Sequence, residues 1–291
     1  MKKCNNPILM HINYFEQGQT IEYTVRRAKS FGYDGIEFRR LPKKAGVSPE
    51  AYIDEIARCM RLYGMEHVVL GAPYVSVLSQ DNEKYRASLD AYKRYLDMAS
   101  QKLDLKLINL FLDPLTNPNA GTFEYNKHGS AYSEPWQWEQ AARACQEIAD
   151  YAPKLKFAFE AHPNYLHDLA PTARKLCDMT DRANMGINLD FGNTVAFEAG
   201  SYPSLEECID LCGEKLFYIH WKNSVPGVGR RLRTALSQGT INHRAYLKKL
   251  MEVGYKGYIC LEAPRDGDRE YFAQEDLAYA KSLISDYNSA L

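Results

Sequence analysis

The sequence lacks long hydrophobic runs and any excess of charge of one sign. Its apolar runs, such as residues 8–10 and 68–70, are far shorter than the roughly 18 apolar residues that a membrane span needs. Thirty-six Lys and Arg residues face 37 Asp and Glu, so no general positive field exists to bind a nucleic acid backbone. The first residues hold no apolar core of about 7–15 residues, which a secretory signal requires. We therefore expect a cytoplasmic protein that contacts neither membranes nor nucleic acids.

Motifs built on cysteine or glycine are also missing. The seven cysteines are scattered without a C-x-x-C pair, so they predict neither structural zinc nor a redox site. Cys208 and Cys212 would share one helical face, but burial in the core is the simpler interpretation. The first apolar run leads into residues 11–15, HINYF, where a dinucleotide-binding fold carries a glycine-rich loop. This absence counts against an open doubly wound sheet.

What the chain does contain is a regular alternation of strand and helix patterns. Apolar or alternating runs recur about every 36 residues, with helical spacing between them. The candidate strands are 7–12, 35–38, 67–70, 106–112, 156–159, 185–189, 216–219 and 257–261. Because such alternation predicts a parallel sheet and no linker interrupts it, we expect an α/β fold in which residues 1–291 form a single (β/α)8 TIM barrel domain.

Local signals mark the helices and one long loop. Ser48 and Pro49 predict the start of a helix that runs over 51–63 and stops before Gly64. Apolar spacing predicts a second helix over 240–253. The connection from the fourth strand to its helix, at about 113–135, is too long for a plain turn, and its aromatic residues favour a lid or a subunit contact.

Four successive strands end in residues that bind metals. Glu160, Asp190, His220 and Glu262 follow the fifth to eighth apolar runs. In a barrel these side chains converge at the carboxyl ends of the strands, where catalysis takes place. Three carboxylates so close together would repel one another, and one divalent cation resolves the conflict. An oxygen-rich set suits Mn²⁺, with Mg²⁺ or Co²⁺ as alternatives, better than structural zinc.

A separate salt bridge or helix cap explains any one of these four residues as well as a shared metal does. It explains all four together less well.

Other polar residues lie beside these strand ends. His162 competes for the role of catalytic base, because it lies two residues beyond Glu160 on an extended segment and titrates near neutral pH. A purely orienting role for His162 is equally open. Candidate substrate contacts, each of which can instead be an ordinary rim or surface residue, are Asn164, Asn193, Lys222, Arg265, Glu37 and His11. In particular, Glu37 can simply pair with Arg39 or Arg40.

The order of these motifs resembles a known family. The stretch 33–38, YDGIEF, the four strand-end residues, and Gly239-Thr240-Ile241 leading to 254–257, GYKG, are similar to the xylose-isomerase-like barrel superfamily of sugar isomerases and epimerases. The resemblance implies one divalent metal on the four strand-end residues. It also implies that Glu160 and Glu262 act as acid and base on opposite faces of the substrate, as in the ketose epimerases of that superfamily.

The resemblance therefore predicts a metal-dependent sugar isomerase or epimerase. Such an enzyme removes a proton next to a carbonyl and passes through an enediolate. The partner would be a small sugar or a 3-oxo-glycoside. The superfamily's habits and the aromatic loop favour a homo-oligomer or a complex with a small partner subunit.

Lyases of the same superfamily are the main alternative. The 3-dehydroshikimate dehydratases and the barrel subunits of C-glycoside deglycosidases share the proton abstraction, and residues 160–164 and 262–269 resemble the second group. Apurinic endonucleases add histidines that this chain lacks, including one that is replaced here by Asn193. A binding module without activity is disfavoured because all four strand-end residues are present. A Schiff-base aldolase is disfavoured because nearby carboxylates would keep Lys222 protonated.

Overall fold

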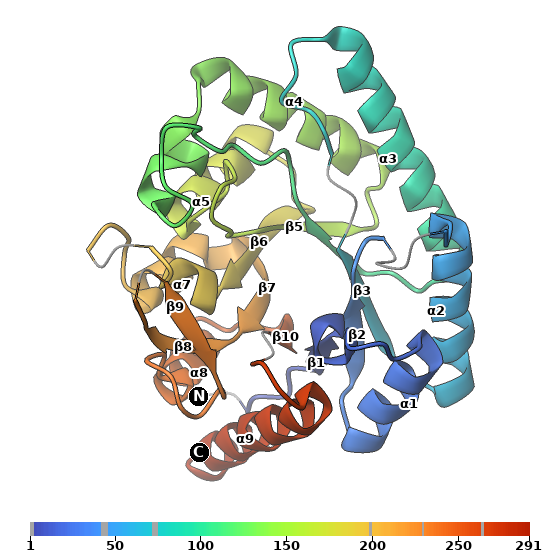
Figure 1. Ribbon diagram of the computed structural model, residues 1–291, viewed down its shortest axis with the longest axis vertical. Coiled ribbons are helices and arrows are strands. Elements are labelled where there is room, and N and C mark those ends of the chain that lie inside the picture. The colour runs from blue at the N-terminus through green and yellow to red at the C-terminus, as the bar shows by residue number, and fades with distance from the viewer. Residues whose placement is uncertain (1–2, 42–45, 72–74, 198–199, 229, 263–264) are drawn as a thin grey trace.

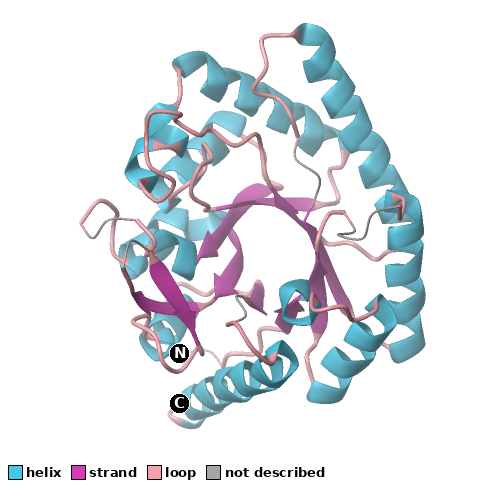
Figure 2. Cartoon of the chain, in the orientation of Figure 1, coloured by secondary structure: helices cyan, strands magenta, loops and turns pink. Residues whose placement is uncertain are grey.

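Eight parallel strands close into a barrel in the computed structural model (Figure 1, Figure 2). The structure describes residues 3–41, 46–71, 75–197, 200–228, 230–262 and 265–291. The barrel strands are β1 Ile8–His11, β2 Gly35–Phe38, β3 His67–Gly71, β4 Leu107–Leu110, β5 Lys156–Glu160, β6 Met185–Asp190, β7 Leu216–Trp221 and β10 Tyr258–Leu261. Each pairs with the next, and β10 pairs with β1. The predicted α/β barrel is confirmed.

Helices surround the barrel, as Figure 2 shows. They are α1 Ile21–Phe31, α2 Pro49–Tyr63, α3 Asn82–Lys102, α4 Pro135–Tyr151, α5 Ala170–Thr180, α7 Leu205–Cys212, α8 His243–Glu252 and α9 Arg269–Ser289, with a single turn, α6, at Phe191–Thr194. Apolar faces of these helices and the outer faces of the strands form the main core, and all seven cysteines are buried. Within the described part of the chain, no helix is long and apolar enough to cross a membrane.

Helix boundaries follow the capping residues. The side chain of Ser48 accepts a hydrogen bond from the backbone of Ala51, and Gly64 ends α2 in a left-handed conformation, as predicted. The helix expected over 240–253 begins only at His243, so that boundary was wrong. Thr240 and Ile241 instead contact the segment after β7, because their backbone N–H groups donate hydrogen bonds to Ser224 O and Asn223 Oδ1.

A hairpin that the sequence patterns did not predict follows the seventh barrel strand. Strands β8 Asn223–Pro226 and β9 Arg231–Thr234 pair antiparallel, outside the barrel sheet. Strand β9 reads RLRT and is largely exposed, so it lacks the apolar face that identifies a strand in sequence. The hairpin projects from the same end of the barrel as the strand-end residues.

Two layers of side chains fill the barrel. The lower layer is a small apolar cluster separate from the main core, made of Leu9, Val69, Leu107, Ala158, Tyr218 and Cys260. Alternate residues of a strand face the same side. Two residues further along these strands the side chains are polar at five positions, namely His11, Asn109, Glu160, His220 and Glu262. Strand periodicity alone therefore sets a polar layer on top of an apolar floor.

The long loop before α4 is fastened to the start of α5. Two short 3₁₀ turns, Tyr125–Lys127 and Gly129–Tyr132, give it internal structure. Asp168 accepts hydrogen bonds from the backbone of Ser130 at 2.9 Å and from the Thr172 hydroxyl at 2.8 Å. Only glycine fits at position 129, because its φ is +56° and a Cβ there would lie 2.5 Å from Asp168 Oδ2.

Asp168→Asn tests this anchor through its pH dependence. Burial raises the pKa of Asp168 to about 6, although both hydrogen bonds oppose the shift. A raised folded-state pKa contributes stability below the unfolded pKa of about 3.9, and this contribution is lost as pH rises through the folded value. Between about pH 4.5 and 7.5, wild type should lose ~2 kcal/mol of unfolding free energy relative to Asp168→Asn in denaturant titrations.

Asp178→Asn, on the exposed side of the same helix, is the control and should show no such trend. A difference between wild type and Asp168→Asn that does not change with pH would contradict the assigned role.

Candidate metal centre

Four side chains meet at the carboxyl ends of β5, β6, β7 and β10. Glu160, Asp190, His220 and Glu262 each offer one ligand atom, and these atoms lie within 4.8 Å of one another. Nδ1 of His220 lies 3.1 Å from Glu262 Oε2, 3.7 Å from Asp190 Oδ2 and 3.8 Å from Glu160 Oε2. The structure therefore brings together the four residues that the sequence proposed as metal ligands.

The other nitrogen of His220 is held from below. His220 Nε2 lies 2.8 Å from Glu37 Oε2, and Glu37 also accepts hydrogen bonds from Tyr218 at 2.7 Å and Asn109 at 2.9 Å. Although burial opposes both shifts, the Glu37–His220 pair raises the pKa of His220 and lowers that of Glu37 to about 2. A carboxylate behind a histidine in this way fixes the ring so that its free nitrogen faces a metal.

Glu37 thus lies beneath the site, where it contacts His220 and does not pair with Arg39 or Arg40 as the sequence allowed. Arg39 pairs instead with Glu16.

Amide side chains position the remaining carboxylates. Asn109 Nδ2 donates to Glu160 Oε2 at 2.7 Å, and Asn193 Nδ2 donates to Glu160 Oε1 at 3.1 Å. Asn13 Nδ2 donates to Glu262 Oε1 at 3.2 Å. Sequence reasoning missed Asn13, Asn109 and Tyr218. A signal existed for Tyr218, which lies two residues before His220 on the same face of its strand.

Lys222 places a second cation among the carboxylates. Its Nζ lies 2.5 Å from Asp190 Oδ2 and 3.1 Å from Glu262 Oε2, and the residue is buried. Burial alone would lower the pKa of Lys222, but Asp190 and Glu262 raise it above its usual value. A lysine held protonated in this way is a poor nucleophile, which argues against Schiff-base chemistry.

Charge is unevenly distributed among the ligands. Burial, together with the carboxylates of Glu262 and Asp190, raises the pKa of Glu160 to about 8. Glu262 behaves oppositely, because Lys222, His11 and His220 outweigh burial and lower its pKa well below the usual value. Three carboxylates and one imidazole form an oxygen-rich donor set that fits a hard divalent cation such as Mn²⁺ or Mg²⁺.

A cavity of about 1060 Å³ lies beside the site at the mouth of the barrel. The four candidate ligands are not among its described lining residues, but Lys222 and Asn193 line it and contact Asp190, Glu262 and Glu160. The walls come from residues 123–127 of the long loop, 162–164, 192–197, the hairpin and 265–269. Among the predicted substrate contacts, the residues that line it are His162, Asn164, Asn193, Lys222 and Arg265. His11 and Glu37 are not among the described lining residues and lie deeper, with the His11 and His220 rings 6.0 Å apart.

The residues after Glu160 form one wall of the cavity. His162 Nδ1 lies 2.8 Å from the carbonyl of Pro163, so Nδ1 carries the proton and Nε2 is left as the basic nitrogen. Asn164 adopts a left-handed conformation with φ of +73°, and its carbonyl accepts a hydrogen bond from Leu115 in the long loop.

On the opposite side, Arg265 pairs with Glu275 and lies over the ring of Phe272. Within the stretch 262–269, Ala263 and Pro264 lie outside the described residues.

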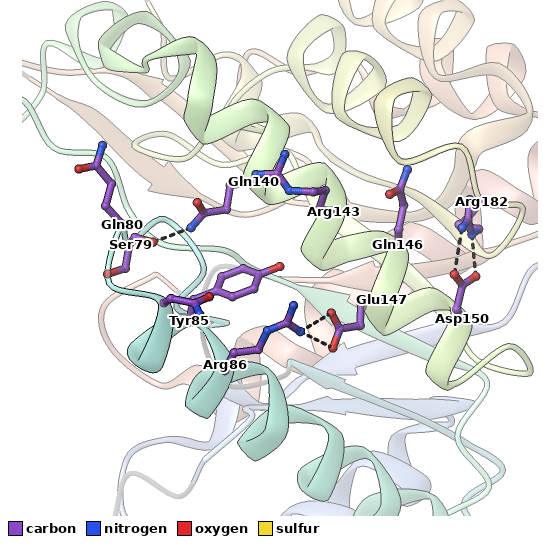
Figure 3. A pocket seen from close by; sticks show the side chains of 11 residues that line it. Ser79, Gln80, Tyr85, Arg86, Gln140, Arg143, Gln146, Glu147, Asp150 and Arg182 are labelled. Carbon is purple, nitrogen blue, oxygen red and sulfur yellow. Dashed lines mark hydrogen bonds and ion pairs between the residues drawn. The ribbon is translucent and has the colours of Figure 1, made fainter.

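A second hollow of about 590 Å³ lies on the outer wall beside α3 and α4 (Figure 3). Four of its charged groups form two ion pairs: Arg86 pairs with Glu147 at 2.9 Å, and Arg182 pairs with Asp150 at 2.6 Å. Its described lining contains none of the predicted site residues. The candidate site residues therefore lie at the strand ends and not beside this hollow.

Comparison with known proteins agrees with this architecture. The sequence model of the xylose isomerase-like TIM barrel family matches residues 25–283, so the chain belongs to that family. An uncharacterized protein of Methanocaldococcus jannaschii is 23% identical over 250 residues, which cover 76% of this chain and 84% of that protein.

Solved structures share the fold at low sequence identity. A xylose isomerase-like TIM barrel protein from Mycobacterium smegmatis, in complex with magnesium, is 19% identical with a TM-score of 0.73, covering 99% of this chain and 100% of that one. D-psicose 3-epimerase from Clostridium cellulolyticum H10, with D-tagatose, is 18% identical with a TM-score of 0.71 and covers 96% and 99%. The probable 3-DHS dehydratase of Bacillus anthracis is 17% identical with a TM-score of 0.68 and covers 94% and 98%.

Glu37→Gln tests whether Glu37 orients His220 toward a metal. The amide keeps the shape of the side chain but removes the negative charge behind the ring. Partners of this kind typically account for about 10–100-fold of metal affinity. We expect calorimetric titration to show Mn²⁺ binding weakened by about 10–100-fold.

Glu147→Gln, the same change in an ion pair on the outer wall, is the control and should leave Mn²⁺ binding unchanged. Equal Mn²⁺ affinity of Glu37→Gln and wild type would contradict the positioning role.

Proposed function

We propose that this protein is a divalent-metal-dependent sugar isomerase or epimerase. The observation that carries the proposal is the convergence of Glu160, Asp190, His220 and Glu262 directly beneath Lys222 and Asn193, which line a sugar-sized or larger cavity and contact these carboxylates. Its substrate would be a ketose or a related oxo-sugar, from which the enzyme removes the proton next to the carbonyl. When bound, the metal ion polarises that carbonyl and lowers the cost of the enediolate.

Glu160 and Glu262 are proposed as the acid and base. In the barrel, β5 and β10 flank β6 and β7, so these two carboxylates stand on either side of Asp190 and His220. A substrate between them presents opposite faces to the two groups, which is the arrangement that epimerisation needs. One carboxylate would take the proton, and the other would return a proton to the opposite face.

Three further residues support the proton transfer in this proposal. Asn193 keeps Glu160 oriented through its hydrogen bond, and Lys222 supplies a positive charge beside the reacting oxygens. His162, with its basic Nε2 on the cavity wall, is the alternative base. We assign Mn²⁺ as the preferred ion, because carboxylates and one imidazole suit it well, with Mg²⁺ and Co²⁺ able to replace it.

A lyase is the second candidate. It would use the same proton abstraction, after which a group on the neighbouring carbon leaves with the bonding electrons. The cavity supports this alternative because it extends from Lys222 and Asn193, beside the four candidate ligands, to the hairpin, which leaves space for an aglycone. The resemblance of this fold to a dehydratase is compatible with such chemistry.

Solvent deuterium exchange tests the shared step. Protein loaded with Mn²⁺ is incubated in D₂O with a panel of ketoses and 3-oxo-glycosides, and products are read by NMR and mass spectrometry. We expect deuterium at the carbon next to the carbonyl, and the product identifies epimerase or lyase. General acid–base groups contribute about 10²–10⁴-fold, so Glu160→Gln and Glu262→Gln should slow exchange by at least about 100-fold.

Chelation should abolish exchange, and added Mn²⁺ should restore it. Glu252→Gln, an exposed change on α8, is the matched control and should exchange like wild type. Exchange that survives chelation, or no exchange into any of these sugars by fully metal-loaded protein, would overturn the proposed function.

A further inference from the structure

The outer part of the cavity is strongly basic, although the chain as a whole is nearly neutral at −1. Its basic lining residues are Lys127, Lys222, Arg230, Arg231, Arg233, Arg265 and Arg269, whereas the acidic residues of its described lining are Glu124 and Asp266. This excess of positive charge is therefore local, and three of the arginines belong to the β8–β9 hairpin.

Some of these charges are already balanced by carboxylates. Lys222 faces Asp190 and Glu262, Lys127 pairs with Glu124, and Arg265 pairs with Glu275. Arg269 is different, because the one hydrogen bond of its guanidinium in the described structure goes to the carbonyl of Asn13, and its Nε is buried without a partner.

Arg231 is fixed by neutral groups only. Its Nε donates to Ser224 Oγ at 2.8 Å and its Nη2 donates to Ser224 O at 3.1 Å, with a further bond to Thr240 Oγ1. Within the described ranges no carboxylate lies within ion-pair distance of its guanidinium. Arg233 lies two residues along the same strand, so both side chains leave the same face of β9, and both line the cavity.

An immobilised, half-buried guanidinium without a counterion loses solvation and receives no compensating charge. An anionic ligand supplies that charge, and the planar fork of donors on arginine matches the oxygens of a carboxylate or a phosphate. The hairpin therefore has the chemistry of an anion subsite.

The size of the cavity agrees with a second subsite. Small-molecule sites usually measure about 300–1,000 Å³. At about 1060 Å³ this cavity is slightly larger than that range, so it accommodates a ligand that reaches from Lys222 and Asn193, beside the four strand-end residues, to the hairpin.

We propose that the substrate carries an anionic group, a carboxylate or a phosphate, at the end remote from its reacting carbonyl, and that Arg231 with Arg233 binds this group. The inference rests on the proposed function, because the carbonyl end is placed at the four strand-end ligands. It narrows the substrate class to sugar acids, sugar phosphates and their glycosides. It also makes the hairpin the element that determines specificity.

Equilibrium binding tests this proposal without requiring turnover. Mn²⁺-loaded protein is titrated calorimetrically with D-fructose, its 6-phosphate and its 6-carboxylate at constant ionic strength. We expect at least one anionic sugar to bind about tenfold or more tightly than fructose. The two anionic arms distinguish phosphate from carboxylate.

Arg231→Gln and Arg233→Gln should each reduce the preference for the anionic sugar over fructose to about threefold or less, because each variant loses a charged hydrogen bond to the anion. Both variants should leave fructose binding unchanged. This comparison also separates the hairpin from direct binding of phosphate to the metal, which neither variant would alter. Arg231→Lys should keep part of that preference, and Arg244→Gln, an exposed change on α8, should keep all of it.

An affinity for both anionic sugars no higher than for fructose, including no measurable binding, overturns the anion subsite. So does a preference that persists in both hairpin variants. Deuterium exchange into neutral ketoses, with no tighter binding of anionic sugars, would agree with the proposed function and contradict the anion subsite. A preference for anionic sugars that depends on Arg231, without deuterium exchange into any sugar, would support the anion subsite and overturn the proposed function.

Discussion

The structure depends on one electrostatic constraint, the crowding of three buried carboxylates at the ends of neighbouring strands. Glu160, Asp190 and Glu262 cannot all be ionised at this spacing unless cations lie among them. Lys222 supplies positive charge from the chain itself, and, although burial opposes the shift, the carboxylates around His220 raise the pKa of its ring, which favours a second positive charge there. A bound divalent ion would supply part of the positive charge that these side chains provide. Positive charge would therefore lie among the carboxylates both with and without the metal ion.

The rest of the barrel holds this unfavourable arrangement in place. The floor of Leu9, Val69, Ala158 and their neighbours excludes water from below, while the Asn109 and Asn193 amides and Glu37 fix the orientation of the groups above. The sign of the charge then reverses toward solvent, where the hairpin arginines form the rim. The charge therefore changes from the acidic residues at the strand ends to a basic rim, so the two ends of the cavity lie beside groups of opposite charge.

The barrel strands, the bounds of α2 and the four strand-end residues could be predicted from the sequence, each for a physical reason. The barrel strands could be predicted because they are buried runs with apolar residues. The bounds of α2 could be predicted because its capping signals lie in the residues next to its ends. The four candidate ligands could be selected from the sequence because each stands where a strand ends, and the structure brings their side chains together. The β8–β9 hairpin was missed because Arg231 and Arg233 face solvent or the cavity instead of a core. The predicted start of α8 was too early, because the backbone N–H of Ile241 donates a hydrogen bond to Asn223 Oδ1, 18 residues earlier in the chain. A contact between residues so far apart in sequence has no local signal. The pairing of Glu37 with His220 spans 183 residues, and no local pattern encodes it.

The central claim is that the four strand ends form one metal site, and anomalous diffraction from crystals soaked in Mn²⁺ tests it most directly. The account predicts a single manganese peak in contact with Glu160, Asp190, His220 and Glu262, with Lys222 no longer bridging Asp190 and Glu262. Density without such a peak at saturating Mn²⁺, and with Lys222 still between the two carboxylates, would contradict it.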